Sequence, residues 1–360
     1  MNADPKRFAK VLLGQALVRS GFWKRSLRLW AERDAVIILY YHRVIEKWDE
    51  TLDYSQPGMV VTASTFERHV AILKEHFEIV TLGALLADRN TAGRATRPRC
   101  VVTFDDGWRD NYDLAFPILR RHDIPATIYL TTDFIGTNRA FWHTELMYLL
   151  TNAKLASLLS DERAFRAYPG PVRHHLKRLA RFDGAAGADN LDPLIETVKA
   201  LCDDDAIEGL VDSLTKAAGI QRPLVLDRTF FLNWDQVRTM AAAGIEIGSH
   251  GCSHRMMTRL PAERADDELI RSKAEIERRV GRKVKHFAFP YEDANGLLLT
   301  AAATAGYRTA CVSRSAAGQG PFGIRSLRRL GMHEGVCGDG RSFDEALLYY
   351  WLFRAPKGPA

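Results

Sequence analysis

Short apolar runs alternate with longer amphipathic segments along most of this chain. The runs are rich in β-branched and aromatic residues, which is typical of buried strands. Gly244, Gly281 and Gly306 stand where three of the amphipathic segments would end as helices. Strands that alternate with helices predict parallel β/α units. The predicted strands are 35–41, 100–104, 126–131, 245–249, 285–289 and 308–312, and the predicted helices are 65–76, 111–122, 235–243, 262–280 and 294–305.

One stretch, 141–232, breaks this alternation. It is poor in strand patterns, carries the helical runs 142–160 and 172–180, and contains a Gly/Ala-rich break at 184–188. We therefore expect a mainly helical insertion over 141–232. It would interrupt a single β/α domain that covers residues 35–340. Residues 1–34 would form a separate N-terminal helical segment.

Composition limits the classes of partner. The chain has 360 residues, of which 46% are hydrophobic and 26% charged, as in soluble globular proteins, and its net charge is +6. The basic residues are scattered and no nucleic-acid-binding module is recognisable, so we expect no nucleic-acid partner. An anionic glycan or a membrane surface suits the charge better. Residues 6–30 alternate bases with large apolar residues, which predicts either a packed helix or a membrane-surface helix.

The compartment is inferred from the cysteines and the N-terminus. Five cysteines, an odd number with no C-x-x-C pair, indicate free thiols in a reducing compartment. The apolar stretch 11–18 is short for a signal core, and no small-residue cleavage site follows it. We therefore expect a cytoplasmic protein, with peripheral contact at the inner membrane face if residues 6–30 form a surface helix.

Polar side chains follow four of the predicted strands. His42 follows the first, Asp105 and Asp106 follow the second, His250 follows 245–249, and Tyr291 lies just after 285–289. The carboxyl ends of strands in a parallel barrel open onto one face, where active sites are built. These residues are therefore expected to share one site.

Two of these motifs carry metal chemistry. Adjacent carboxylates that leave a strand point in different directions, so either Asp105 or Asp106 can bind a metal while the other faces its water. His250 and His254 have the i, i+4 spacing that places two rings on one side of a turn, with Cys252 pointing away. Two histidines and one carboxylate suit one divalent ion, Zn²⁺ first, and Co²⁺, Ni²⁺, Mn²⁺ or Fe²⁺ otherwise. Non-haem iron oxygenases use the same ligands, usually on a double-stranded β-helix, which the β/α alternation argues against.

Taken together, the motifs resemble the polysaccharide deacetylase family (carbohydrate esterase family four, the nodulation-factor deacetylase homology domain). The resemblance implies an α/β fold, a distorted parallel (β/α) barrel of about seven strands. It also implies a hydrolase that removes N-acetyl groups from an amino-sugar unit of a polysaccharide, oligosaccharide or glycolipid. The motifs are Thr103-Phe104-Asp105-Asp106-Gly107 with Asn111-Tyr112, Ile247-Gly248-Ser249-His250-Gly251-Cys252-Ser253-His254, and Phe287-Ala288-Phe289-Pro290-Tyr291.

The resemblance assigns roles residue by residue. Asp105 would be the general base, and Asp106, His250 and His254 would bind the metal. Tyr291 would stabilise the oxyanion through its backbone N–H. The segment Tyr40-Tyr41-His42-Arg43-Val44 resembles a permuted version of the catalytic-histidine motif, which makes His42 the candidate general acid.

Three positions depart from the family pattern. Gly251 stands where Ser or Thr is usual, and Ala288 stands where an arginine often orients the base. Arg329 is the candidate substitute for that arginine. No histidine motif follows the late strands in the usual place, although His333 lies in that region. Because of these departures, a non-catalytic glycan-binding relative of the deacetylases is kept as the alternative function.

Overall fold

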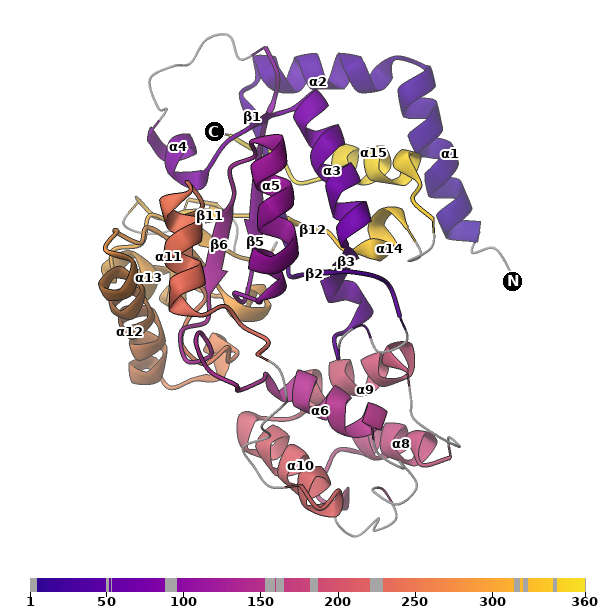
Figure 1. Cartoon of the computed structure of the whole chain (residues 1–360), viewed down its shortest axis with the longest axis vertical. Helices are drawn as coiled ribbons and strands as arrows, with labels where there is room; N and C mark the ends of the chain where they lie inside the picture. The colour runs from indigo at the N-terminus through magenta and orange to yellow at the C-terminus, as the bar shows by residue number, and fades with distance from the viewer. Residues whose placement is uncertain are drawn as a thin grey trace. The chain divides into compact units, whose positions relative to one another are not determined.

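A curled, mainly parallel β-sheet lies at the centre of the larger of two compact units in the computed structural model (Figure 1). The first unit comprises residues 1–47, 61–136 and 231–360, and the second comprises 48–60 and 137–230. The structure describes residues 5–49, 52, 54–87, 96–152, 159, 165–181, 187–220, 229–313, 318–319, 323–338 and 342–359.

The described strands of the sheet follow the order β10-β11-β9-β8-β7-β6-β5-β1-β12. All neighbours from β11 to β12 along this order are parallel, and β10 is antiparallel to β11. The sheet curls into a half-barrel, which confirms the predicted α/β fold with a distorted parallel barrel. Two more strands join this sheet beside that order: β4 (Glu78–Ile79) pairs in parallel with β5, and β13 (Gly358–Pro359) pairs antiparallel with β1. The strands of the order are β1 (Ala35–Tyr41), β5 (Arg99–Phe104), β6 (Thr127–Leu130), β7 (Glu246–Ser249), β8 (His286–Ala288), β9 (Thr309–Cys311), β10 (Gly318–Gln319), β11 (Arg325–Leu327) and β12 (Leu330–Gly331).

The late strands β11 and β12 lie toward opposite ends of this strand order, yet two residues join them. Strand β11 ends at Leu327 and pairs with β9, whereas β12 begins at Leu330 and pairs with β1. Arg328 and Arg329 therefore run from one side of the half-barrel to the other. We call this two-residue connection the seam.

Strands β1 and β5 pair in parallel from Val36 opposite Arg99 to Tyr41 opposite Phe104. The backbone N–H of Asp105 continues this ladder by donating to the carbonyl of Tyr41 at 2.9 Å. The residues that follow the two strands therefore emerge side by side at the same edge of the sheet.

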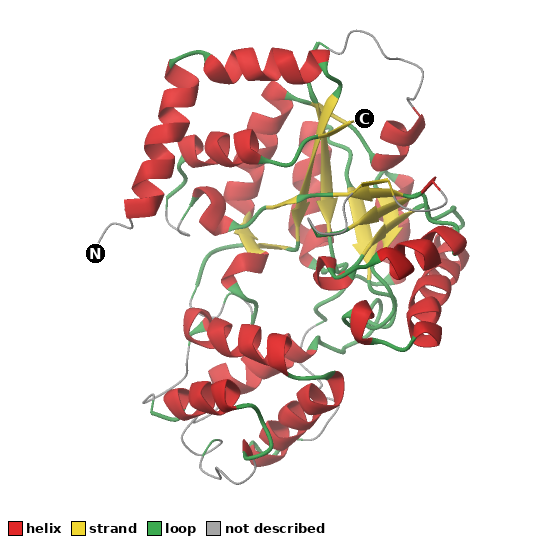
Figure 2. Ribbon diagram, turned by 180° about the vertical axis from the view of Figure 1, so that it is seen from behind, coloured by secondary structure: helices red, strands yellow, loops and turns green. Residues whose placement is uncertain are grey.

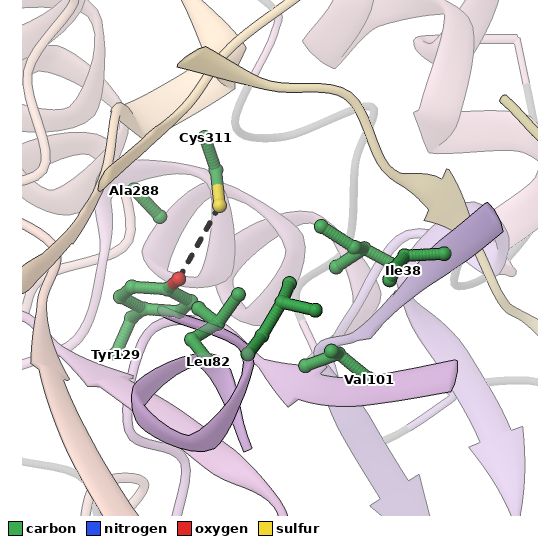
Figure 3. Close-up of a cluster of buried hydrophobic side chains, with 8 residues drawn as sticks. Ile38, Leu82, Val101, Tyr129, Ala288 and Cys311 are labelled. Atoms are coloured by element: carbon green, nitrogen blue, oxygen red, sulfur yellow. Dashed lines mark hydrogen bonds between the residues drawn. The ribbon is translucent and has the colours of Figure 1, made fainter. Parts of the chain in front are cut away.

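A cluster of buried side chains packs inside the half-barrel (Figure 3). Val36 and Ile38 are two residues apart on β1, so both point to the same face of the sheet. Tyr129 lies at one side of the cluster near Ala288, and its hydroxyl forms a hydrogen bond of 3.3 Å with the Cys311 sulfur. Burial of these side chains fixes the curvature on which the strand ends are placed.

Helices flank the sheet on its outer side (Figure 2), and all five helices predicted between the strands form. The predicted helix 111–122 begins with a π-helical turn, Asn111–Ala115, before α5. The N-terminal segment forms two helices, because Gly21 breaks it with a φ of 72°. The helices are α1 (Pro5–Arg19), α2 (Phe22–Glu32), α3 (Ala63–His76), α5 (Phe116–His122), α11 (Trp234–Ala242), α12 (Ala262–Val280), α13 (Gly296–Thr304), α14 (Glu334–Cys337) and α15 (Glu345–Arg354).

The second unit is helical wherever the structure describes it between residues 137 and 230, apart from turns and loops. Its apolar core takes Leu191, Leu194 and Val198 from one face of a single helix, α9. Residues 153–158 and 160 of the predicted helix 142–160, and 184–186 of the predicted break, lie outside the described residues. Its helices are α6 (Trp142–Asn152), α8 (Gly170–Leu179), α9 (Ala188–Leu201) and α10 (Asp204–Ala217).

Candidate active site

Asp106, His250 and His254 meet where β5 and β7 end. The Oδ1 atom of Asp106 lies 3.2 Å from the Nε2 atom of each histidine, and all three side chains are buried. This Oδ1 atom accepts no well-aligned hydrogen bond, although it is shielded from solvent. One carboxylate oxygen and two imidazole nitrogens that converge in this way fit a divalent cation.

Neighbouring groups hold two of these ligands in place. The indole Nε1 of Trp108 donates to the other oxygen of Asp106 at 2.7 Å, which directs Oδ1 toward the histidines. The Nδ1 atom of His250 donates to the backbone carbonyl of Ala288 at 2.6 Å. Because Nδ1 carries the proton in that bond, Nε2 of a neutral His250 presents a lone pair to the cluster. Trp108 is fully buried, so its hydrogen bond to Asp106 is shielded from solvent.

Glu268 of α12 fixes the loop that carries the two histidines. Its carboxylate accepts hydrogen bonds from the backbone N–H of Cys252 at 2.5 Å and of Ser253 at 3.0 Å, and from the Ser253 hydroxyl at 2.5 Å. A Cβ at Gly251, where φ is 79°, would lie 2.9 Å from a Glu268 oxygen. Gly251 therefore suits the close approach of Glu268, which restrains the loop without the hydroxyl usual at position 251. Cys252 is buried against α12 and is not part of the ligand cluster.

The backbone is also strained at two positions of the cluster. His254 has a φ of 58° and Asp106 a φ of 75°, both in the left-handed region that side-chain-bearing residues rarely adopt. Such backbone conformations cost of order 1–3 kcal/mol each and persist only where surrounding contacts enforce them. Two ligands of one cluster share this feature, which is typical of functional sites.

Arg329, in the seam, forms a two-pronged ion pair with Asp105. The Nη1–Oδ1 and Nη2–Oδ2 distances are both 2.7 Å, and both side chains are buried. The guanidinium also lies over the Tyr40 ring, 4.4 Å from its centroid. Ala288, where the family pattern often has an arginine, belongs to the buried apolar cluster inside the half-barrel. Arg329 thus supplies from the seam the cation that β8 lacks.

Burial and charge oppose each other at the two carboxylates. Burial by itself would raise the pKa of Asp105, but Arg329, with smaller contributions from His250 and His42, outweighs it and lowers that pKa. Burial also opposes ionisation of Asp106, and His254 and His250 together hold its pKa well below the usual range. Both carboxylates are therefore ionised at neutral pH.

The segment after β8 adds Tyr291 and a second acidic residue. Tyr291 has a φ of 58°, and its ring packs against His254 with centroids 4.8 Å apart. Glu292 lies 3.5 Å from the Nε atom of Arg329 and is three-quarters buried in side-chain terms. Burial is the main cause that raises the pKa of Glu292, and Asp105 adds to it. Sequence reasoning missed Glu292, although its place directly after Tyr291 was the available signal.

His42 and His333 follow the neighbouring strands β1 and β12. Leu39 pairs with Leu330, so the two histidines continue the same register. The carbonyl of His42 accepts a hydrogen bond from Asn111 Nδ2 at 2.8 Å, which anchors its backbone. Burial, followed by the nearby His42, lowers the pKa of His333.

His42 is close enough to the ligand cluster to influence it electrostatically. It is among the groups that lower the pKa values of Asp105, Asp106 and His254. The structure therefore brings His42, Asp105, Asp106, His250, His254 and Tyr291 to one end of the sheet. It places His333 beside His42.

Comparison with known proteins agrees with this arrangement. The family model described as polysaccharide deacetylase matches residues 92–168 and 207–310, together half of the chain. The two matched segments contain both aspartates, both histidines of the cluster, and Tyr291. The chain belongs to the polysaccharide deacetylase family.

Individual relatives are more distant. The chain is 30% identical over 123 residues to the poly-β-1,6-N-acetyl-D-glucosamine N-deacetylase of Staphylococcus epidermidis, a match that covers 32% of this chain and 42% of that relative. The structure of the deacetylase PplD of Streptococcus pyogenes, solved in complex with acetate, matches with a TM-score of 0.53 at 16% identity. This match covers 88% of this chain and 98% of the PplD chain. BC0361, a polysaccharide deacetylase from Bacillus cereus, has a TM-score of 0.51 at 16% identity, with 88% and 69% covered. These two structures share the fold with this chain.

Proposed function

We propose that this protein is a metal-dependent hydrolase that removes N-acetyl groups from an amino-sugar unit of a polysaccharide, oligosaccharide or glycolipid. One observation carries the proposal. An ionised carboxylate, Asp105, is held by Arg329 directly beside the buried cluster of Asp106, His250 and His254. A base next to a metal site is the arrangement that hydrolysis by an activated water requires.

Asp106, His250 and His254 would hold the ion, with one carboxylate oxygen and two Nε2 atoms as ligands. This ligand set suits Zn²⁺ first, and it also accepts Co²⁺, Ni²⁺, Mn²⁺ or Fe²⁺. A divalent ion bound there would polarise the acetamide carbonyl and lower the pKa of a water from about 15.7 towards about 7.

The remaining steps belong to the chain's own residues. Asp105 accepts the proton of the attacking water, and Arg329 keeps this carboxylate ionised and oriented. The backbone N–H of Tyr291 donates to the developing oxyanion, a kind of donor worth on the order of 3 kcal/mol in the barrier. His42 protonates the leaving amine, because an unprotonated amine is expelled too slowly for C–N cleavage. The products are acetate and a free amino sugar.

The substrate class rests on the family and on one relative. The Staphylococcus epidermidis relative is named for a polymer of β-1,6-linked N-acetylglucosamine. An N-acetylated hexosamine glycan is therefore the substrate class we propose for this chain. The alternative of a non-catalytic glycan-binding protein arose from Ala288 and from the lack of a histidine motif after the late strands. The Arg329–Asp105 pair weakens the first of these two arguments.

Acetate release tests the proposal. Purified protein loaded with Zn²⁺ or Co²⁺ is assayed on β-1,4- and β-1,6-linked N-acetylglucosamine oligomers, and we expect free acetate and new amines in equal amounts. Asp105→Asn should lose at least about 10²-fold in turnover while it keeps its metal. Asp113→Asn, an exposed aspartate in the segment after the same strand, is the matched control. Oligomer binding without acetate release by the metal-loaded protein would establish the glycan-binding alternative instead.

A further inference from the structure

The N-terminal helices α1 and α2 expose an unusual amount of apolar surface. Among the described residues, six of the ten exposed large apolar side chains belong to residues 8–29. Scattered exposed apolar residues are normal, but their concentration in one short segment marks an interaction surface. The six side chains are Phe8, Leu12, Leu13, Val18, Phe22 and Leu29, which are 41–60% exposed.

The inner side of the helix pair is already packed. Gly14 is buried, and a Cβ at that position would lie 1.9 Å from the backbone oxygen of Ala346 in α15. The backbones of α1 and α15 are therefore in direct contact, which only glycine allows. In α2, Trp23 is 2% exposed and meets Tyr349 of α15 with ring centroids 5.1 Å apart. Both helices are thus packed against the rest of the first unit, and they run along its outer border in both views (Figures 1 and 2).

The outer side of α1 is apolar as well. Phe8 and Leu12 are four residues apart, as are Ala9 and Leu13, so all four side chains lie on one exposed face of the helix. A helix that is apolar on both faces is normally buried on both. One face of α1 lies on α15, and the outward face is exposed in this chain.

Charge indicates what covers this face. Residues 5–33 contain eight Lys and Arg residues and one acidic residue, Glu32. The exposed cations flank the apolar face: Lys6 and Arg19 near the ends of α1, and Lys24, Arg25 and Arg28 on α2. A symmetric dimer through this face would bring the five flanking cations of each copy together, ten in all, which is unfavourable. A polar anionic glycan would satisfy the cations and leave the apolar side chains in water.

We propose that the outward face of α1 and α2 docks on the surface of an anionic phospholipid bilayer. Phe8, Leu12 and Leu13 would enter the boundary between headgroups and acyl chains, and the flanking cations would bind the lipid phosphates. No described helix is both long enough and apolar enough to cross a bilayer. The proposed contact is a surface contact. The packing of Gly14 and Trp23 against α15 would hold the first unit to the docked helices.

Vesicle flotation tests the proposal. The full chain is mixed with vesicles of phosphatidylcholine alone or with 30% phosphatidylglycerol, at low and high salt. We expect binding to the anionic vesicles that weakens as salt is raised, since each cation near the surface contributes roughly fivefold in affinity. The triple variant Phe8→Ser, Leu12→Ser, Leu13→Ser and the triple variant Lys24→Glu, Arg25→Glu, Arg28→Glu should each lose at least about tenfold.

Ile270→Ser with Leu297→Ser is the matched control, because these two side chains are 56% and 82% exposed elsewhere on the first unit. The control should bind vesicles like the unaltered chain, and all variants should keep acetate release on soluble oligomers. If the control variant lost as much vesicle binding as the α1 variant, the proposal would be overturned. The proposal would also be overturned if the unaltered chain did not bind anionic vesicles. A dimer that the α1 variant abolishes, in the absence of vesicle binding, would identify a second copy of the chain as the partner instead.

Discussion

Arg329 binds both carboxylate oxygens of Asp105, with Nη1–Oδ1 and Nη2–Oδ2 distances of 2.7 Å each. A planar guanidinium fixes both the direction and the charge of a carboxylate, which the compact ammonium of lysine cannot do. Asp105 is accordingly held in one orientation, and it is buried from bulk water.

Arg329→Lys should therefore lower kcat by roughly 10- to 100-fold with little change in KM. The charge is kept, so metal content should not change, whereas the orientation of Asp105 is lost. Arg329→Met should lose more, because it also leaves Asp105 buried without a counter-charge. Arg328→Lys, at the exposed neighbour in the seam, is the control. A kcat for Arg329→Lys equal to that of the control would show that Asp105 needs no such partner.

Glu268→Gln should weaken metal binding by about 10- to 100-fold, because outer-shell groups that restrain metal ligands have effects of this size. The carboxylate accepts three hydrogen bonds from the loop that carries His250 and His254. Metal affinity is measured by competition with a chelator of known affinity. Asp267→Asn, one residue away and exposed on the same helix, should bind metal normally. Equal affinities of the two variants would mean that the loop holds its shape without Glu268.

His42→Ala should leave metal content intact and remove most amide hydrolysis, since no group would protonate the leaving amine. An activated acetate ester, whose leaving group needs little protonation, should be hydrolysed nearly as fast as by the unaltered chain. His333→Ala is the informative comparison because His333 lies beside His42 at the end of the adjacent strand. If His333→Ala shows the amide-specific loss and His42→Ala does not, the acid is His333.

A buried histidine outside the site predicts how stability depends on pH. His69 of α3 is fully buried, its Nδ1 lies 3.1 Å from the Tyr41 hydroxyl, and its Nε2 contacts the Cys337 sulfur. Burial, with a smaller contribution from His333, lowers the pKa of His69 to about 3. The unfolded chain takes up a proton at this residue near pH 6.5, and the folded chain does not.

The free energy of unfolding is therefore not reduced by His69 above pH 6.5, and it decreases as the pH falls from 6.5 toward 3. The loss should reach about 2 kcal/mol between pH 7 and pH 5, at about 1.4 kcal/mol per pH unit. Urea unfolding at several pH values measures it, and His69→Gln should flatten this slope. His174→Gln, on the exposed surface of α8, controls for a change in total histidine count. A slope that His69→Gln leaves unaltered would contradict the prediction.

The strands and helices that position the site could be predicted because each has a clear period. Strand β1 was predicted at its observed bounds, 35–41, and helix α12 likewise at 262–280. Strand β12 has two residues, Leu330–Gly331, which is too short for any hydrophobic pattern. It is defined only by its pairing with β1, a tertiary property that local sequence does not contain.

The same distinction applies to the candidate site. Asp106, His250 and His254 are the residues of two local motifs, so their meeting could be anticipated from strand ends alone. Glu268 lies in the middle of a long amphipathic helix among other acidic residues, and nothing local distinguishes it from them. Arg329 was predicted as the partner of Asp105 because it lies in a basic run, and the ion pair agrees with that prediction. The sheet order explains how the seam brings this arginine to Asp105.

Because the seam carries Arg329, the order in which the strands pair during folding decides when Asp105 becomes oriented. The candidate metal ligands follow β5 and β7, whose pairing with β6 needs only the middle of the chain. Arg329 reaches Asp105 once β12 has found β1, a pairing between segments near opposite ends of the sequence. Contacts of such long sequence separation form slowly, because the loop-closure entropy must be overcome first. A newly made chain would thus form its candidate metal site before Arg329 orients Asp105. A folding intermediate without the β1–β12 pairing would then bind metal but would not hydrolyse substrate.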